Sequence, residues 1–305
     1  MKKNLKMSAA ILAAVMVMGS LTACGGSSSD PTTAAAKDTT AAAADSGSTA
    51  AADSGSATGD VTADVQKIID AGVLKVGVKT DVPCFSLQNT ATGEYEGLED
   101  DLAYNIAGQI FGCTPDEAKE KKLVEFQGVT AKTRGPLVEN GELDMVIATF
   151  TITEERKETY NFSTPYFTDA VGLLVLKESG INSIEDLDGK VIGVAQGSTS
   201  QKGFEAYVAE KGINVKPTFE EFDGYPALAA ALSAKNIDVF SVDRAILAGY
   251  RDDTNKLLDD RYAEQEYGVC TKKENTGLAE LVDGVVTDLK DSGKLAEMIK
   301  DWGIE

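Results

Sequence analysis

The sequence predicts an α/β fold of two lobes joined by two crossing strands, and three observations lead to it. With 305 residues, the chain is longer than one average domain needs. From residue 61 onward, short β-branched segments alternate with segments of helical periodicity, which is typical of α/β layers with mostly parallel strands. Two extended stretches, 166–172 and 265–271, predict crossings between the lobes. The first lobe is then discontinuous (61–167 and 267–305), and residues 168–266 form an inserted second lobe.

Residues 1–23 predict a secretory signal peptide. Three lysines precede an almost unbroken apolar run at 7–18, which is too short to span a bilayer comfortably. The run ends at Leu21-Thr-Ala-Cys24-Gly25, which resembles the lipobox of bacterial lipoproteins, so we predict a lipid on Cys24. A plain signal peptide with a chance cysteine is the alternative. Cleavage before Cys24 removes three lysines and no acidic residue, which takes the formal net charge from −20 to −23.

Residues 24–60 predict a disordered linker behind the lipid anchor. Ser, Thr, Ala, Gly and Asp dominate the stretch, and it contains no aromatic residue. Such a composition buries too little apolar surface to offset the entropy of ordering the backbone. An Ala-rich helix is the alternative, and the interspersed Gly, Ser and Thr weaken it.

The elements of the folded part follow in a regular order. A β-branched strand is expected at 73–78, and a helix at 98–110 carries Leu102, Ile106 and Ile110 on one stripe. A strand at 123–126, a short helix at 136–140 and a buried strand at 144–148 complete this part of the first lobe. The second lobe is expected to contain strands at 172–176, 191–194, 215–219 and 239–241, with helices at 198–211, 225–234 and 245–250. The segment 277–302 is helical, and Gly293 divides it into two helices.

Composition excludes several classes of function. The formal net charge of −20 argues against nucleic acid and anionic lipid as partners, because both would be repelled. The chain has no histidine, which removes Ser-His-Asp and Cys-His catalysis and histidine-containing metal sites. Cys84, Cys113 and Cys270 are interpreted first as small hydrophobic residues and second as the source of one disulfide. No cofactor, metal or catalytic residue is expected.

Six segments between residues 73 and 302 carry a family resemblance. They are DMVIATFTITEERK at 144–157, YNFSTPY at 160–166, LDGKVIGV at 187–194, QGSTS at 196–200, DVFSVD at 238–243 and YG at 267–268. Together they resemble the family 3 bacterial solute-binding proteins, the receptors of polar amino-acid importers. This resemblance implies a type II periplasmic-binding fold that closes on its ligand like a hinge. Within the family, VTAKTRGPL at 129–137 is similar to the aspartate/glutamate-binding branch.

A free amino acid is a zwitterion, so its receptor must replace water at one carboxylate and one ammonium. The planar guanidinium of arginine matches a carboxylate bidentately. The resemblance implies that Arg156 clamps the α-carboxylate, and it assigns Thr149 and Thr151 to the same ligand site. A surface ion pair of Arg156 with Glu154 or Glu155 is the alternative.

The second lobe is expected to contribute Ser198, Thr199 and Asp243. Ser198 and Thr199 stand between a strand and a helix, where free N–H groups favour an anion. Helix capping is the alternative for this loop. The resemblance implies that Asp243 binds the α-ammonium of the ligand, and N-capping of the following helix is the competing role.

Three further residues complete the expected site. Arg134 lies in the segment that resembles the acidic branch, so it is predicted to bind a side-chain carboxylate. Lys79 ends the first strand, where α/β ligand sites commonly lie. An ordinary solvated cation is the alternative for both, and Asp81 would repel an acidic ligand unless it is paired. Tyr225 is a candidate for the pocket wall, as are Phe85 and Phe126, with aromatic core packing as the simpler interpretation.

The resemblance implies a lipid-anchored receptor on the extracytoplasmic face of a bacterial cell membrane. It would capture a free amino acid, preferably glutamate or aspartate, for the permease and ATPase subunits of an ABC importer, and it is expected to be a monomer. The sequence leaves glutamine, asparagine and cystine open as ligands. Two other functions stay open: an enzyme like cyclohexadienyl dehydratase, which needs a general acid, and a sensor that reports to a separate signalling partner.

Overall fold

Strands from three sheets organise the part of the chain that the structure describes, residues 61–304 of a computed structural model. The predicted signal peptide, Cys24 and the linker lie outside the described residues. The strands are β1 (Leu74–Val78), β2 (Asp81–Val82), β3 (Ser86–Gln88), β4 (Tyr95–Glu96), β5 (Val124–Gly128), β6 (Met145–Val146), β7 (Tyr160–Phe162), β8 (Phe167–Leu176), β9 (Val191–Ala195), β10 (Thr218–Phe222), β11 (Val239–Asp243), β12 (Asn255–Leu257), β13 (Tyr262–Tyr267) and β14 (Cys270–Lys272).

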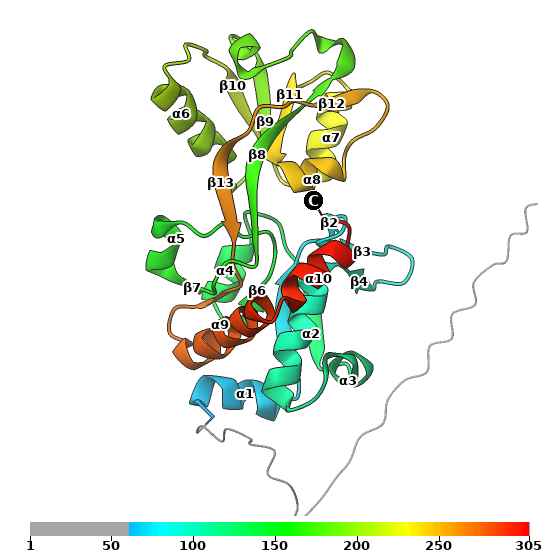
Figure 1. Ribbon diagram of the computed structural model, residues 1–305, viewed down its shortest axis with the longest axis vertical. Helices are drawn as coiled ribbons and strands as arrows, with labels where there is room; N and C mark the ends of the chain where they lie inside the picture. Colours follow the sequence, from blue (N-terminus) through cyan, green and yellow to red (C-terminus); the bar gives the residue numbers. More distant parts are fainter. Residues whose placement is uncertain (1–60, 305) are drawn as a thin grey trace, which may run out of the picture. The chain divides into compact units, whose positions relative to one another are not determined.

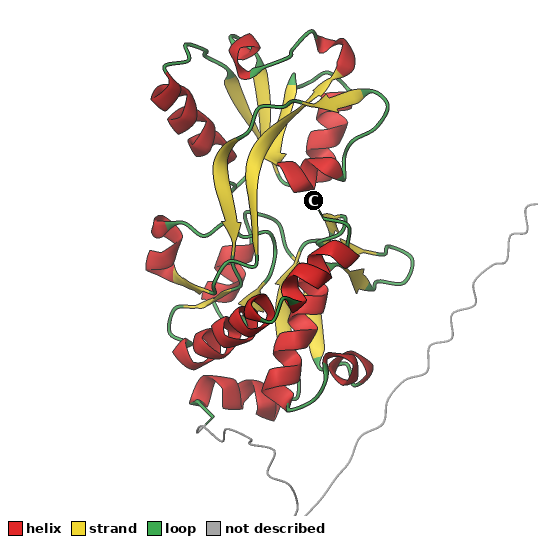
Figure 2. Cartoon of the chain, in the orientation of Figure 1, coloured by secondary structure: helices red, strands yellow, loops and turns green. Residues whose placement is uncertain are grey.

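Helices pack on these sheets (Figures 1 and 2). They are α1 (Ala63–Ala71), α2 (Leu98–Phe111), α3 (Pro115–Glu120), α4 (Arg134–Glu139), α5 (Glu154–Thr159), α6 (Ser200–Lys211), α7 (Tyr225–Ser233), α8 (Arg244–Ala248), α9 (Thr276–Asp291) and α10 (Lys294–Asp301), with short 3-10 helices at Lys177–Ser179 and Ile184–Leu187. Among the helices between residues 61 and 304, none combines the length and the apolarity that a transbilayer helix requires.

The first lobe contains the sheet β5-β1-β6-β14-β7. Strand β1 pairs in parallel with β5 and β6, as the alternation of strands and helices predicts. Helix α2 covers this sheet, and its stripe of Leu102, Ile106 and Ile110 is buried, as expected. Helix α4 packs against β1 and β6, and the N–H of Ile147 after β6 donates to the carbonyl of Gly77 in β1 at 2.9 Å, so the C-terminal ends of these strands adjoin each other.

The second lobe contains the sheet β10-β9-β11-β8-β12. Strand β9 pairs in parallel with β10 and β11. Strand β8 pairs antiparallel with β11, β12 and β13, and in the first lobe β14 pairs antiparallel with β6 and β7. The prediction of mostly parallel pairing is therefore wrong. Strands β8 and β14, which lie at or next to the crossings between the lobes, run antiparallel to their neighbours. The strand expected at 215–219 forms three residues later, as β10.

Strands β8 and β13 are the two crossings, and they run side by side between the lobes in Figure 1. Their register pairs Phe167 with Tyr267 and Thr168 with Glu266. The expected crossing stretches overlap both strands. The lobe boundaries at 167/168 and 266/267 fall inside this antiparallel ribbon and stay a prediction.

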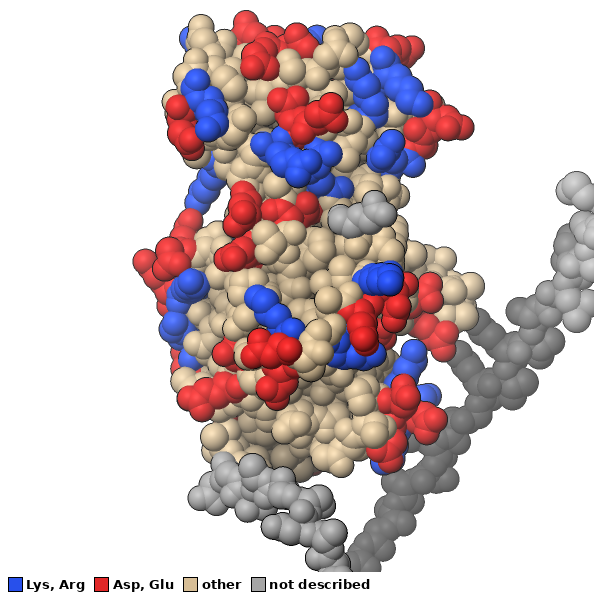
Figure 3. Space-filling model, viewed as in Figure 1, with Lys and Arg blue, Asp and Glu red and all other residues tan. Residues whose placement is uncertain are grey.

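Several elements give little sequence signal. Helices α1 and α3 and the small sheet β2-β3-β4 have no counterpart among the predicted elements. Cys84, Cys113 and Cys270 are all free thiols, which contradicts the disulfide. Cys270 is buried, as the first interpretation expects of a small hydrophobic residue, whereas Cys84 is exposed, so that interpretation is wrong for Cys84. On the face drawn in Figure 3, acidic and basic side chains are interspersed over both lobes, so no single-sign field dominates that face.

Helix α2 begins at a glycine that packs directly against the chain of Phe85. The backbone N–H groups of Leu98 and Glu99 donate to the carbonyls of Cys84 and Phe85, both at 2.9 Å. A Cβ at Gly97 would come within 2.0 Å of the carbonyl oxygen of Phe85. The absence of a side chain at Gly97 thus lets the first turn of α2, which carries Glu99, dock where it does.

We expect Gly97→Ala to lower the free energy of unfolding by about 1–3 kcal/mol, the usual cost of an overpacked site. The matched control is Gly284→Ala in α9, where a new Cβ meets nothing within 4 Å. That variant should gain about 0.5–1 kcal/mol, since alanine favours a helix interior. Urea unfolding followed by circular dichroism measures both. Equal shifts in the two variants would contradict the packing role of Gly97.

Candidate functional site

Arg156 connects the two lobes through backbone carbonyls. It lies in the first turn of α5, where the hydroxyl of Thr153 accepts from the N–H of Arg156 and caps the helix. Its Nη1 donates to the carbonyl of Thr151 at 2.7 Å, and its Nη2 donates to the carbonyl of Gly197 in the second lobe at 3.0 Å. Burial, with the charge of Arg134 second, lowers the pKa of Arg156 to about 9.

The surface-pair alternative for Arg156 is wrong in this structure. Glu154 pairs with Lys157 at 2.8 Å, and Glu155 pairs with Lys202 of α6 at 2.8 Å. Both neighbouring carboxylates therefore have other cations. The second of these pairs is exposed and joins the lobes, so it contributes little and is screened by salt.

Phe150 links Arg156 to Arg134. The two guanidinium carbons lie 4.6 Å and 4.1 Å from the centroid of its ring. Arg134 is 3% exposed and donates from Nη1 to the carbonyls of Ala148 at 2.6 Å and Thr149 at 2.9 Å. Its Nε is buried without a hydrogen-bond partner. A buried cation held only by carbonyls and a ring retains the capacity to bind an anion.

Lys79 is buried and paired. Its Nζ lies 3.2 Å from Oδ1 of Asp81 and 4.5 Å from the centroid of the Tyr225 ring. Burial lowers the pKa of Lys79, and the charge of Asp81 opposes this shift. The solvated alternative for Lys79 is wrong, and so is the solvated alternative for Arg134. Asp81, which the sequence marks as a source of repulsion, is paired by Lys79.

Asp243 has the position of an N-cap but does not act as one. Its side chain makes no capping bond to α8 and accepts instead from the hydroxyl of Tyr267. The first turn of α8 is capped by Asp169, whose Oδ2 accepts from the N–H of Ala245 at 2.8 Å. Burial raises the pKa of Asp243 to about 7, against the lowering effect of the Tyr267 bond. With capping taken over by Asp169, one oxygen of Asp243 remains available to a cation.

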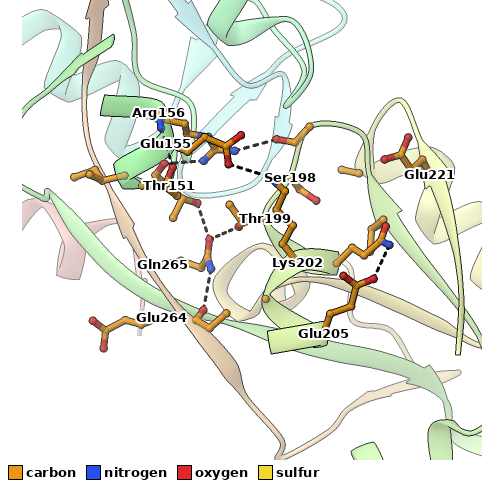
Figure 4. A pocket seen from close by; sticks show the side chains of 18 residues that line it. Thr151, Glu155, Arg156, Ser198, Thr199, Lys202, Glu205, Glu221, Glu264 and Gln265 are labelled. Carbon is orange, nitrogen blue, oxygen red and sulfur yellow. Dashed lines mark hydrogen bonds and ion pairs between the residues drawn. The ribbon is translucent and has the colours of Figure 1, made fainter. Parts of the chain in front are cut away.

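The loop before α6 and Thr151 both line an open cavity of about 860 Å³ (Figure 4). The hydroxyls of Thr151 and Thr199, one from each lobe, both donate to Oε1 of Gln265, at 2.6 Å and 2.7 Å. The N–H of Ser198 donates to the carbonyl of Ala195 at 3.1 Å. Thr199 makes no side-chain capping bond to α6, so capping is not its role.

The expected residues form two groups. Thr151, Arg156, Ser198 and Thr199 line the cavity. The others are buried away from its lining: Lys79, Arg134, Thr149, Tyr225 and Asp243. Phe150 joins the groups, because it contacts one arginine of each. In the buried group, Arg134 Nε has no hydrogen-bond partner among the described residues.

Three residues that sequence reasoning missed belong to this arrangement. Phe150 lies between the guanidiniums, Gln265 ties Thr151 to Thr199, and Glu99 accepts from the N–H of Thr149 at 2.6 Å. The alternation of strand β13 places Gln265 on the same face as the buried Tyr267. A polar residue at an inward-facing strand position could have been recognised in the sequence as a candidate for a buried hydrogen-bonding role. Phe85 and Phe126, by contrast, pack against other aromatic rings, as the core interpretation holds.

Comparisons with known proteins agree with the two-lobed fold. The family model for bacterial extracellular solute-binding proteins, family 3, matches residues 74–305. The glutamine-binding protein of Geobacillus stearothermophilus is 37% identical over 267 residues, covering 87% of this chain and 92% of the relative. The ABC transporter glutamine-binding protein GlnH of Bacillus subtilis is 35% identical over 238 residues, covering 77% and 82%. The crystal structure of a mutant ArgBP from T. maritima has a TM-score of 0.67 at 27% identity, covering 79% of this chain and 100% of that one.

We expect Asp243→Asn to change how the stability of the ligand-free protein depends on pH. The folded pKa of Asp243, about 7, lies above the ordinary value of 3.8, so the native state keeps a proton that the unfolded chain releases. Stability contributed by this group therefore falls as pH rises between these two values.

Between pH of about 5 and 8, wild type should lose about 2–3 kcal/mol more free energy of unfolding than Asp243→Asn. Urea titrations of protein refolded to remove co-purified amino acids measure this. Glu178→Gln, at an exposed acid paired with Lys235, is the control and should follow wild type. Parallel pH profiles of wild type and Asp243→Asn would show that Asp243 is already ionised at the lower pH.

Proposed function

The chain belongs to family 3 of the bacterial extracellular solute-binding proteins, and on this premise we propose that it binds a free amino acid for an ABC importer. In this proposal the receptor works as a monomer and hands its ligand to separate permease and ATPase subunits. Two similar relatives are named as glutamine-binding proteins, one of them as an ABC transporter protein. The support from the site is that it offers both charges that a zwitterion needs.

The two ends of the zwitterion are assigned to opposite lobes. Arg156 takes the α-carboxylate, helped by Thr151 and by the loop of Ser198 and Thr199, where the N–H of Thr199 is the better candidate. Asp243 takes the α-ammonium, with Thr149 beside it. A ligand that bonds to both lobes stabilises the closed arrangement by mass action.

The ligand side chain is assigned from Arg134, and this residue carries the proposal of an acidic amino acid. Lys79 has Asp81, Arg156 is committed to the α-carboxylate and Asp243 to the ammonium. Among the described residues, Arg134 takes part in no ion pair, although it is 3% exposed. A buried cation without an anion is costly, so a glutamate or aspartate side chain is the partner that satisfies it.

Glutamine is the second candidate, and two observations favour it. The similar relatives from Geobacillus stearothermophilus and Bacillus subtilis carry glutamine in their names. Glu99 also lies near enough to Arg134 for each charge to affect the other. An ionised Glu99 would offset the charge of Arg134 and reduce the need for an acidic ligand. The dehydratase alternative has no support from these relatives, which are named as binding proteins.

We expect Arg134→Met to remove the preference for acidic ligands. Methionine keeps most of the apolar stem against Phe150 and removes the charge. Glutamate and aspartate should lose about 2–5 kcal/mol of binding free energy, or roughly 30- to 5,000-fold in affinity, and the amides much less. Calorimetry with all four ligands on wild type and variant measures the ratio of dissociation constants.

Arg156→Ala is the matched control, because it removes the arginine on the other side of the same ligand. Acid and amide share the α-carboxylate, so both should weaken by a similar factor of at least about 30. Equal weakening of acid and amide in Arg134→Met would assign Arg134 to the fold. A wild type that prefers glutamine would refute the acidic ligand and leave the receptor function standing.

The anchoring of the receptor is a separate proposal, made from the Leu21-to-Gly25 motif outside the described residues. We expect Cys24→Ser to leave the precursor uncleaved or to release the protein from the membrane, because a serine lacks the thiol that accepts the lipid. Detergent partitioning and intact mass of wild type and variant, expressed in a bacterium, test this. Cys113→Ser controls for loss of a thiol. If wild type also partitions into water at the unmodified mass, Cys24 carries no lipid.

A further inference from the structure

Glu99 is a fully buried carboxylate under the ligand site. It lies in the first turn of α2 and is 0% exposed. Its Oε1 accepts from the N–H of Thr149 at 2.6 Å and from the hydroxyl of Tyr166 at 2.5 Å, whereas its Oε2 has no hydrogen-bond partner. A carboxylate oxygen buried without a donor is costly in the ionised state, and a proton on that oxygen removes the cost.

The bond from Thr149 holds an unusual backbone conformation. Thr149 has φ of +45°, the left-handed region, which a β-branched residue rarely adopts. Its N–H is fixed by Glu99 and its carbonyl accepts from Nη1 of Arg134. One residue of backbone thus separates the carboxylate from the guanidinium that is proposed to read the ligand side chain.

The charged groups around Glu99 come from several elements. Arg134 of α4 and Lys79 at the end of β1 favour its ionised form, as do the bonds from Tyr166 and Thr149. Asp100, its neighbour on α2, is also buried, and the charge of Glu99 helps to raise the pKa of Asp100. Burial outweighs the favourable contacts and raises the pKa of Glu99 to about 7. The carboxyl therefore changes its charge near neutral pH.

We propose that Glu99 selects the charge of the ligand: with a proton on Oε2 the site favours an acidic amino acid, and without it the site favours the neutral amide. In both states Oε1 keeps Thr149 in its left-handed conformation, so Glu99 is a positioning residue as well. This inference rests on the proposed function, because it names what sets selectivity at the same Arg134.

The physical basis is a balance of buried charge. With Glu99 protonated, Arg134 lacks an anion and an acidic side chain supplies it. With Glu99 ionised, a second carboxylate at Arg134 adds repulsion that an amide does not have. The preference for glutamate over glutamine should therefore fall as pH rises through about 7, the pKa of Glu99.

The test uses L-glutamate and L-glutamine on refolded, ligand-free protein at pH of about 5.5, 7 and 8.5. The quantity is the dissociation constant for glutamine divided by that for glutamate. Glutamate and glutamine share the same α-ammonium and α-carboxylate, so the pH dependence of binding these groups, including that of Asp243, cancels in this ratio. For wild type we expect a fall of at least about five-fold across the range, the lower end of typical coupling between sites.

Glu99→Gln keeps the oxygen that Tyr166 and Thr149 need and removes the charge. Its ratio should be independent of pH and should equal the wild-type ratio at the lowest pH. Asp100→Asn is the matched control, since Asp100 is buried on the same helix with a pKa raised to about 8 but bonds to Ser86 and not to the ligand loop. It should retain the wild-type fall. Glu99→Ala also removes the acceptor and should weaken both ligands.

Two results overturn the inference: a ratio in Glu99→Gln that still follows wild type, or an equally flat profile in Asp100→Asn. If wild type binds only glutamine, the acidic-ligand proposal fails first. Glu99→Gln must then gain affinity for glutamate at the highest pH, and no gain refutes the role of Glu99. A wild type that binds no amino acid refutes the proposed function itself, and with it this inference.

Discussion

The free-energy cost of burying charged side chains is the constraint on which this part of the structure depends. Arg134, Lys79 and Asp243 are all nearly inaccessible to solvent, and Arg156 is partly buried beside them. Each of these buried charges needs a partner that is itself held in place by the fold. Asp81 serves Lys79, backbone carbonyls and the Phe150 ring hold both arginines, and Tyr267 bonds to Asp243. In the proposed function, the polar atoms that these contacts leave without a partner are the ones that bind the ligand.

The surrounding fold follows from supplying those partners from both lobes. Asp169 caps α8 and so frees Asp243 from the task that its position would otherwise impose. Gln265, on a crossing strand, accepts a hydrogen bond from one hydroxyl of each lobe and therefore ties the Thr151 and Thr199 loops to the ribbon between them. Gly97 allows α2 to dock close to Phe85, which brings Glu99 beneath Thr149. Local contacts of this kind thus determine where the buried charged side chains lie.

Much of this could be predicted from the sequence, and the remainder has a physical reason. Strong periodicity and β-branched runs located β1, α2, β9 and α7, and motif order identified the two-lobed fold and marked most residues of the proposed site. The direction of strand pairing could not be predicted. Strands β8, β13 and β14 lie at or next to the crossings between the lobes, and tertiary contacts decide whether they pair parallel or antiparallel. The left-handed Thr149 and the capping by Asp169 are equally invisible, since both arise from residues distant in sequence. Glu99 gave no signal because an acid in a first helical turn is ordinarily solvent-exposed.

The pairing of β8 has a mechanical consequence. Residues Val171–Val175 of β8 are held by β11, and its C-terminal end is also held by β12. Between Phe167 and Ala170 its only strand partner within residues 61–304 is β13, and a bulge at Ala263 ends this stretch. A strand that is paired on both sides resists twisting, whereas a two-stranded ribbon twists more easily. We therefore expect bending between the lobes to be concentrated in the few residue pairs that β8 shares with β13 alone.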